Sequence, residues 1–331
     1  MIKWLLAFLC SFALSLILMP FIIKFLRRQH ASQTILGYVE NHKEKNGTLT
    51  MGGVVFMLST LLLVFVFLKF DTVWLVCLLV SVFFGILGLL DDYLKVKFKQ
   101  NLGLRAYQKI IGQFGIALIF AVFVYLMSKG SLIYLPFSNK SIDIGFWIIP
   151  LIVLVMIATT NSVNLTDGLD GLAGNSANIY IIFFFLINTV TLNQLYTMGE
   201  TGAIINNLSN INMLCMLFSG SILAFLMFNT NKASIFMGDA GSLCLGGFIG
   251  TSACVVGQPL LIPILGFVFV FSTISVIIQV ISFKSTGKRV FKMSPFHHHL
   301  QMCGLSENKI VAIYSAVTVS IGVICLIFYL I

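Results

Sequence analysis

Apolar segments of about the length needed to cross a lipid bilayer recur along the whole chain. A helix spans roughly 30 Å of hydrocarbon with about 20 residues, and it satisfies its own backbone hydrogen bonds there. Ten stretches approach this length: 4–25, 51–69, 73–90, 109–128, 145–161, 176–192, 210–228, 240–257, 260–283 and 309–330. The sequence therefore predicts an all-α, polytopic integral membrane protein with about ten transmembrane helices in a single domain over residues 1–331.

The composition excludes a soluble domain of this size. The chain is 59% hydrophobic and only 9% charged, and its mean hydropathy is +1.03. The ninth apolar stretch, 260–283, contains Pro263 and Gly266, which both weaken a helix. We therefore predict that this stretch is kinked or broken and that it shapes a groove for lipid.

The basic residues predict the orientation of the chain in the membrane. Sixteen of the twenty lysines and arginines lie in segments 24–49, 91–109, 229–239 and 284–309. The positive-inside rule makes these segments cytoplasmic, so ten spans leave both termini outside. The net charge of +9 then reflects membrane topology and an anionic lipid or substrate. A nucleic-acid partner is not expected, because that would need a soluble basic domain.

Five of the eleven acidic residues lie at or near helix ends on the predicted cytoplasmic side, where a membrane protein seldom places charge without a function. They are Asp91, Asp92, Asp167, Asp170 and Asp239. An ion-coupled transporter, the alternative from a different class, would more often carry polar residues near the midplane and on both sides. An intramembrane aspartyl protease would need two aspartates on facing helices. The one-sided distribution favours an enzyme at the inner membrane surface.

Asp91 and Asp92 close an apolar run and are followed by Lys95. On a helix, adjacent side chains point about 100° apart, so we expect the two aspartates to have different roles. The alternative is simple charge pairing, since Asp91 and Lys95 have the i, i+4 spacing at which helical side chains meet.

The segment 161–174 carries Asn164, Asp167 and Asp170 at intervals of three residues, interleaved with glycines. On a helical turn these side chains would share one arc, and exposed backbone N–H groups at a helix start suit a phosphate-bearing ligand. The alternative is an ordinary capping loop rich in Asn, Asp and Gly.

Asp239 precedes the eighth apolar stretch and could be only an N-cap residue. Because five aspartates converge on one membrane face, we instead predict a cation among them. Oxygen ligands favour a hard ion, and Mg²⁺ commonly takes one or two carboxylates plus substrate phosphates. Magnesium is therefore the predicted cofactor.

Two further segments on this side contain residues suited to anion binding. His297, His298 and His299 follow a basic stretch and predict phosphate recognition or proton transfer; zinc is disfavoured because adjacent residues rarely aim three imidazoles at one ion. The segment from Lys45 to Gly53 is a glycine-bearing helix start without the residue order of a P-loop, so ATP is not indicated.

These motifs in this order resemble those of the polyprenyl-phosphate N-acetylhexosamine-1-phosphate transferases. They are Asp91-Asp92-Tyr93, Asn164-x-x-Asp167-Gly-x-Asp170-Gly, Phe236-Met-Gly-Asp239 and His297-His-His299. Within that superfamily, Gly47-Thr-Leu-Thr-Met-Gly-Gly53 and the triple histidine are similar to the phospho-N-acetylmuramoyl-pentapeptide transferases of peptidoglycan synthesis. The nearest alternative is a sister enzyme that transfers GlcNAc-1-phosphate for teichoic acid or O-antigen synthesis.

The resemblance implies an Mg²⁺-dependent transfer of phospho-MurNAc-pentapeptide from its UDP conjugate to undecaprenyl phosphate. The products would be lipid I and UMP, formed at the cytoplasmic face of a bacterial inner membrane. The partners are thus a UDP-sugar, a polyprenyl phosphate and membrane lipid. The oligomeric state stays open, with a homodimer as one candidate.

The resemblance also implies roles for individual residues. Asp239 would bind Mg²⁺, Asp91 and Asp92 would act at the reacting phosphates, and His297 would join them in catalysis. The implied nucleotide, sugar and phosphate contacts are Lys45, Thr50, Lys109, Asn164, Asp167, Gly168, Leu169, Asp170, Asn229, Phe236, Gln279, His298 and His299.

Overall fold

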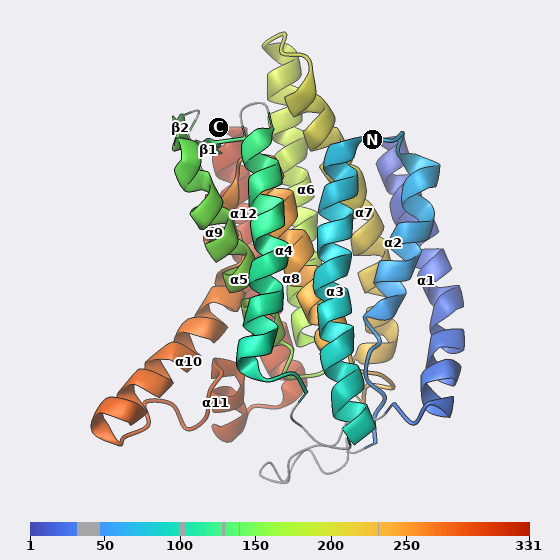
Figure 1. Ribbon diagram of the computed structural model, residues 1–331, viewed down its shortest axis with the longest axis vertical. Coiled ribbons are helices and arrows are strands. Elements are labelled where there is room, and N and C mark those ends of the chain that lie inside the picture. Colours follow the sequence, from blue (N-terminus) through green and yellow to red (C-terminus); the bar gives the residue numbers. More distant parts are fainter. Residues whose placement is uncertain (32–46, 99–102, 128–129, 139, 231) are drawn as a thin grey trace.

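Long helices make up most of the described chain (Figure 1). The computed structural model describes residues 1–31, 47–98, 103–127, 130–138, 140–230 and 232–331. The helices are α1 (Ile2–Arg28), α2 (Val54–Phe67), α3 (Thr72–Phe98), α4 (Ala106–Leu126), α5 (Ile148–Thr166), α6 (Leu172–Thr197), α7 (Ala203–Asn229), α8 (Gly238–Val255), α9 (Ile262–Leu265), α10 (Phe267–Thr286), α11 (Phe296–Met302) and α12 (Glu307–Leu330). Short 3₁₀ turns at Gly145–Trp147 and Pro259–Leu261 precede α5 and α9.

The predicted all-α membrane architecture is confirmed. A helix forms on each of the ten predicted segments. Within the described residues, eight helices are long and apolar enough to cross a bilayer. The other two are α2, which is a shorter apolar helix, and α8. The count of ten crossings therefore stays a prediction.

Helix α8 lies inside the bundle and is rich in small residues. Every side chain from Ala240 to Val255 is buried. Small residues allow helix backbones to approach closely in a membrane protein. The clearest case is Gly88 of α3, where an added Cβ would collide with the backbone of Asp239. This contact places the end of α3 beside the start of α8.

The ninth predicted span is broken, as expected. Gly266 lies outside helical geometry between α9 and α10, with φ −91° and ψ 26°. Pro263 falls in the first turn of α9, where a missing N–H costs no hydrogen bond. In Figure 1, α10 leans away from the bundle at its lower end. The lipid groove remains a prediction.

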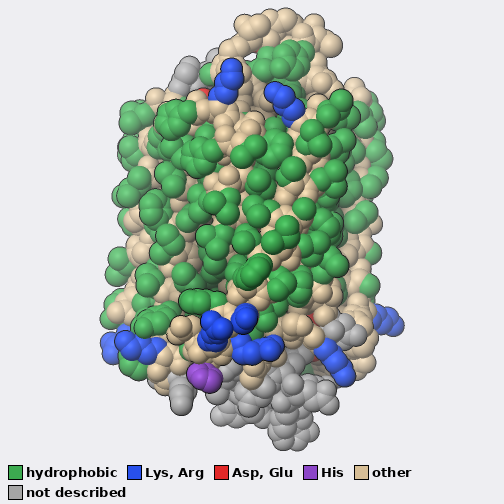
Figure 2. Space-filling view, turned by 90° about the vertical axis from the view of Figure 1, so that its right-hand side faces the viewer, with side chains coloured by type: hydrophobic (Ala, Val, Ile, Leu, Met, Phe, Trp, Pro, Cys, Tyr) green, Lys and Arg blue, Asp and Glu red, His purple; other side chains and the backbone are tan. Residues whose placement is uncertain are grey.

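The surface of the bundle is banded. In Figure 2, hydrophobic side chains cover the middle of the visible face, and lysines and arginines gather mainly along its lower rim. Both termini lie at the upper end in Figure 1. Their shared side agrees with an even number of crossings, while the assignment of that side to the exterior stays a prediction.

The loop between α4 and α5 contains a small hairpin that the sequence analysis did not predict. Strands β1 (Leu132–Tyr134) and β2 (Ser141–Asp143) pair antiparallel. A three-residue strand is too short to show a recognisable alternation of polar and apolar residues. The hairpin is anchored by a backbone hydrogen bond of 2.8 Å from Tyr134 N to Gly257 O, a residue distant in sequence.

Candidate active site

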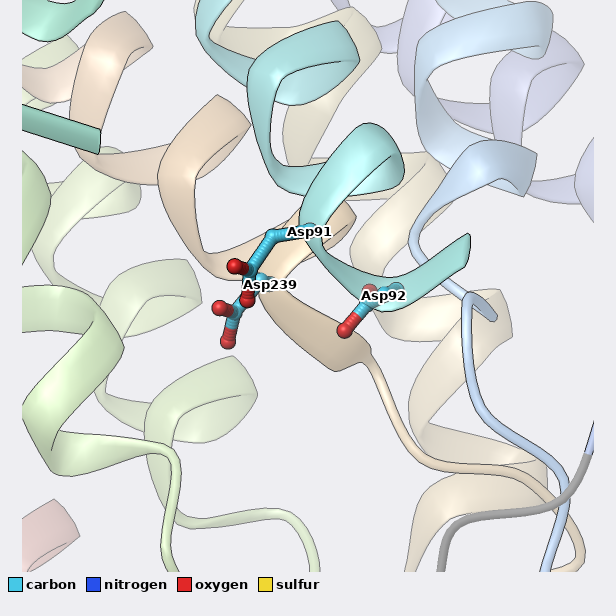
Figure 3. Close-up of side chains that lie close together, drawn as sticks. All are labelled: Asp91, Asp92 and Asp239. Carbon is cyan, nitrogen blue, oxygen red and sulfur yellow. The ribbon is translucent and has the colours of Figure 1, made fainter. Parts of the chain in front are cut away.

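Three carboxylates meet where α3 ends and α8 begins. Each of Asp91, Asp92 and Asp239 offers one oxygen, and these oxygens all lie within 4.8 Å of one another. Asp91 and Asp92 are buried, and Asp239 is half-buried. Figure 3 shows the side chains of Asp91 and Asp239 next to each other, with Asp92 set apart from them. We call these three residues the carboxylate cluster.

The two adjacent aspartates have different hydrogen-bond partners. Asp92 Oδ2 accepts from Ala240 N at 3.0 Å, so Asp92 satisfies a backbone donor at the start of α8. Asp91 Oδ1 accepts from Leu104 N at 2.6 Å. The N-cap alternative for Asp239 is wrong, because Met237 is the N-cap residue of α8 and Asp239 lies inside the helix.

Two lysines neutralise much of the negative charge. Lys95 Nζ lies 2.6 Å from Asp91 Oδ2, 3.8 Å from Asp92 Oδ1 and 3.0 Å from Asp239 Oδ2. Lys109 Nζ lies 2.9 Å from Asp239 Oδ2. The i, i+4 pair of Asp91 and Lys95, which was the alternative interpretation, thus exists, but Lys95 also contacts Asp239 of α8. Nothing in the local spacing of Lys95 indicates this contact with Asp239.

Helix α5 supplies an amide to the same centre. Asn164 Nδ2 donates to Asp239 Oδ1 at 2.7 Å and to Ser242 Oγ at 2.8 Å, while Lys109 Nζ donates to Asn164 Oδ1 at 3.4 Å. Ser242, near the start of α8, was not among the predicted site residues. The predicted single arc of Asn164, Asp167 and Asp170 is wrong, because α5 ends at Thr166 and a turn follows.

The turn between α5 and α6 is tied to the loop before α8. Asp170 Oδ2 accepts from Ala233 N at 3.1 Å. Asn229 accepts from Gly171 N at 3.0 Å and donates to Ile235 O at 2.9 Å. These polar atoms of Asp170 and Asn229 therefore hold backbone in place. Leu169 of this turn is buried.

Asp167 lies in this turn, and its carboxyl group is repelled by the negative charge of the cluster. Burial, followed by repulsion from Asp239, Asp92 and Asp170, raises the pKa of its carboxyl group to about 8. A carboxyl group with such a pKa gains most from a nearby cation. Asp167 is thus electrostatically coupled to the cluster without belonging to the group within 4.8 Å.

The three histidines lie on a short helix, α11, whose N-cap residue is Pro295. His297 is fully buried, and neither of its ring nitrogens has a hydrogen-bond partner among the described residues. Burial, aided by the neighbouring His298, lowers the pKa of His297 to about 3, so its imidazole is neutral at neutral pH.

The three imidazoles have different neighbours. An added Cβ on Gly168 would collide with His297 Nε2, so the turn after α5 and helix α11 are in close approach. His298 Nδ1 lies 2.8 Å from Gln301 Oε1. His299 Nδ1 accepts from Lys292 N at 3.2 Å. That zinc is disfavoured at these histidines stays a prediction.

Thr50, Phe236 and Gln279 are further predicted substrate contacts. The loop with Thr50 pairs with the loop before α8, since Phe236 N donates to Leu49 O at 2.7 Å. Gln279 Oε1 accepts from Val290 N at 3.1 Å, so its amide holds a loop. Lys45 lies outside the described residues.

The cluster has the chemistry of a hard-cation site. Three carboxylates from two helices can supply several oxygen ligands, and the two lysines could also neutralise a diphosphate. A cavity of about 320 Å³ lies elsewhere, lined in part by Gln258 beyond the end of α8. Asp239 is in the first turn of this 18-residue helix, so the cavity lies about 27 Å from the cluster and is not its binding pocket.

The chain is similar to known proteins along most of its length. Residues 74–257 match the model of glycosyl transferase family 4. The chain is 40% identical over 327 residues to a phospho-N-acetylmuramoyl-pentapeptide-transferase of Clostridium novyi (strain NT), covering 97% of this chain and 94% of the relative. It is 42% identical over 318 residues to the protein of that description from Geobacillus sp. (strain WCH70), covering 94% and 93%. For the relative from Bacillus mycoides (strain KBAB4), identity is 41% over 320 residues, covering 94% and 92%.

Proposed function

The chain belongs to the phospho-N-acetylmuramoyl-pentapeptide transferases of glycosyl transferase family 4, and from this membership we propose its substrates, cofactor and site residues. The donor is UDP-MurNAc-pentapeptide and the acceptor is undecaprenyl phosphate. The products are undecaprenyl-diphospho-MurNAc-pentapeptide, which is lipid I, and UMP. The observation that carries this proposal is the carboxylate cluster with two lysines at one end of a membrane bundle.

The transfer exchanges one diphosphate linkage for another. An oxygen of the lipid phosphate forms a bond to the β-phosphorus of the donor. The bond from that phosphorus to the oxygen that bridges the two donor phosphates breaks, and UMP leaves with this oxygen and its electron pair. Because a phosphate monoester is largely ionised at neutral pH, the enzyme mainly has to position two anions and stabilise their charge.

The residues of the site divide this work. Asp239 would hold Mg²⁺, with Asp91 and Asp92 beside it, and the bound ion would neutralise charge on the diphosphate. Lys109 would stabilise charge on the phosphates, and Asn164 orients Asp239 through its 2.7 Å hydrogen bond. The neutral imidazole of His297 can offer a hydrogen bond to substrate but no positive charge.

The remaining contacts would form the nucleotide and sugar pocket. Phe236 would stack on uracil, and the turn that contains Asp167, Gly168 and Asp170 would contact the donor beside His298 and His299. We place this site at the cytoplasmic face of a bacterial cytoplasmic membrane. The basic lower rim in Figure 2 supports this orientation through the positive-inside rule.

A UMP-release assay tests the proposal. Purified protein receives undecaprenyl phosphate and UDP-MurNAc-pentapeptide, with Mg²⁺ or with EDTA. We expect UMP and a lipid-linked product only with Mg²⁺. A parallel reaction offers UDP-GlcNAc as the donor. If only UDP-GlcNAc were turned over, the chain would be a GlcNAc-1-phosphate transferase instead. Equal turnover with Mg²⁺ and with EDTA would contradict the proposed Mg²⁺ dependence.

A further inference from the structure

Gln113 of α4 and Asn161 of α5 form a reciprocal pair of side-chain hydrogen bonds inside the bundle. Asn161 Nδ2 donates to Gln113 Oε1 at 2.7 Å, and Gln113 Nε2 donates to Asn161 Oδ1 at 3.3 Å. Asn161 Nδ2 also donates to Ile157 O of its own helix at 2.8 Å, and Gln113 is fully buried. Among the described residues, the hydrogen bonds of this pair do not reach the carboxylate cluster.

The pair lies directly behind two residues that do contact the cluster. Lys109 precedes Gln113 by four positions, and Asn164 follows Asn161 by three, so each helix presents both residues on one face. Lys109 and Asn164 bind the two carboxylate oxygens of Asp239 at 2.9 and 2.7 Å. Helices α4 and α5 therefore meet at two successive levels, which are about 6 Å apart along α4.

We propose that the Gln113–Asn161 pair is a positioning element that sets the register of α4 against α5. Apolar contacts between helices tolerate sliding, whereas two complementary amide hydrogen bonds are satisfied at one offset only. The pair thereby fixes Lys109 Nζ at Asp239. Because both amides are uncharged, they do this without changing the charge of the site. The proposal rests on the transfer reaction proposed above, in which Lys109 acts on the phosphates.

Three variants test the proposal by UMP release and thermal unfolding. Gln113→Leu leaves Asn161 without its partner, and we expect kcat to fall about 10- to 100-fold, with KM for both substrates changed less than about threefold. Gln113→Leu/Asn161→Leu leaves no unpaired amide, so Tm should recover while kcat stays low. The exchange Gln113→Asn/Asn161→Gln can restore both hydrogen bonds and should return kcat to within about threefold of wild type.

Asn212→Leu is the matched control. Asn212 is a buried amide of α7 that donates to Thr189 Oγ1 of α6 at 3.1 Å, 17 positions before the end of α7 near the site. We expect its replacement to lower Tm and leave kcat unchanged. If Gln113→Leu does not fold, kcat and Tm of the two double variants test the positioning role.

Two results would overturn the positioning role. One is a wild-type kcat in Gln113→Leu, and the other is recovery of kcat together with Tm in the double leucine variant. If wild-type protein releases no UMP, the proposed function fails and the positioning role falls with it. If wild-type protein releases UMP and the Gln113 variants keep its kcat, the positioning role fails while the proposed function stands.

Discussion

The ammonium group of Lys95 lies 3.0 Å from Asp239 Oδ2, although 144 positions separate the two residues in the chain. The same ammonium lies 2.6 Å from Asp91 Oδ2. A single lysine of α3 thus holds together carboxylates from both helices of the cluster. Any divalent cation that binds these oxygens must compete with this lysine or share them with it.

Replacing Lys95 should therefore tighten divalent-cation binding. A charged group within about 4–6 Å changes the proton affinity of a carboxylate by 1–3 pKa units, so we expect the Kd for Mn²⁺ to fall about tenfold in Lys95→Met. The measurement is Mn²⁺ titration followed by electron paramagnetic resonance, without substrates. Unfolding in EDTA should occur at a lower temperature than in wild type, since three carboxylates lose a shared counter-ion.

Lys97→Met is the control for Lys95→Met. Lys97 lies on the same helix, but its ammonium is over the rings of Tyr93 and Phe98, at 5.8 and 5.9 Å from their centroids. Its replacement should leave Mn²⁺ affinity unchanged. Equal or weaker Mn²⁺ binding in Lys95→Met would contradict the competition.

Asp239→Asn should abolish catalysis while the protein still folds and inserts. The amide cannot supply the negative charge that a divalent cation needs, and we expect UMP release to fall by about 10³-fold or more. Size-exclusion chromatography and Tm report folding. The control is Asp143→Asn, which alters an exposed carboxylate of β2 that accepts from Gly145 N at 2.9 Å. Full activity of Asp239→Asn would refute the metal assignment.

The parts of the site that could be predicted are those whose chemistry is costly in a membrane. Asp91 and Asp92 were identifiable because paired charge at the end of an apolar helix suggests a function, and Asp239 because five aspartates converge on one predicted membrane face. The break near Gly266 was equally predictable, since it depends on local residues.

Contacts made only in the folded chain could not be predicted in this way. Lys95 reaches Asp239 only because Gly88 brings α3 against α8, and this proximity leaves no mark on the spacing of either segment. Gln113 and Asn161 are 48 positions apart, and each alone is an ordinary polar residue in an apolar helix. The turn after α5 was misjudged because Asn164 and Asp167 have helical spacing across a helix end.

Asp167→Asn should stabilise the protein and impair its activity. Burial and neighbouring carboxylates raise the pKa of Asp167 to about 8, so its ionised form is disfavoured in the folded protein. The resulting loss of folding stability is absent below the ordinary carboxyl pKa of about 4, and it grows as the pH rises toward 8. We expect Tm at pH 7 in EDTA to rise by a few degrees, with the difference vanishing near pH 4. A lower Tm at pH 7 would contradict this electrostatic strain.

His297 should make the protein sensitive to acid. Its pKa falls from an ordinary value near 6.5 to about 3 in the folded state, because burial and His298 disfavour the charged ring. The unfolded chain therefore binds a proton that the folded chain rejects as the pH drops below 6.5. The resulting loss of stability is about 1.4 kcal/mol for each pH unit between 6.5 and 3.

His297→Gln removes this titration, so its free energy of unfolding should change less than that of wild type between pH 7 and pH 5. Denaturant unfolding in detergent at both pH values measures the difference. His30→Gln, at an exposed position beyond α1, is the control and should keep the wild-type dependence. Parallel pH dependences for wild type and His297→Gln would show that the imidazole becomes charged inside the fold. In that case His297 could meet the donor diphosphate as a cation.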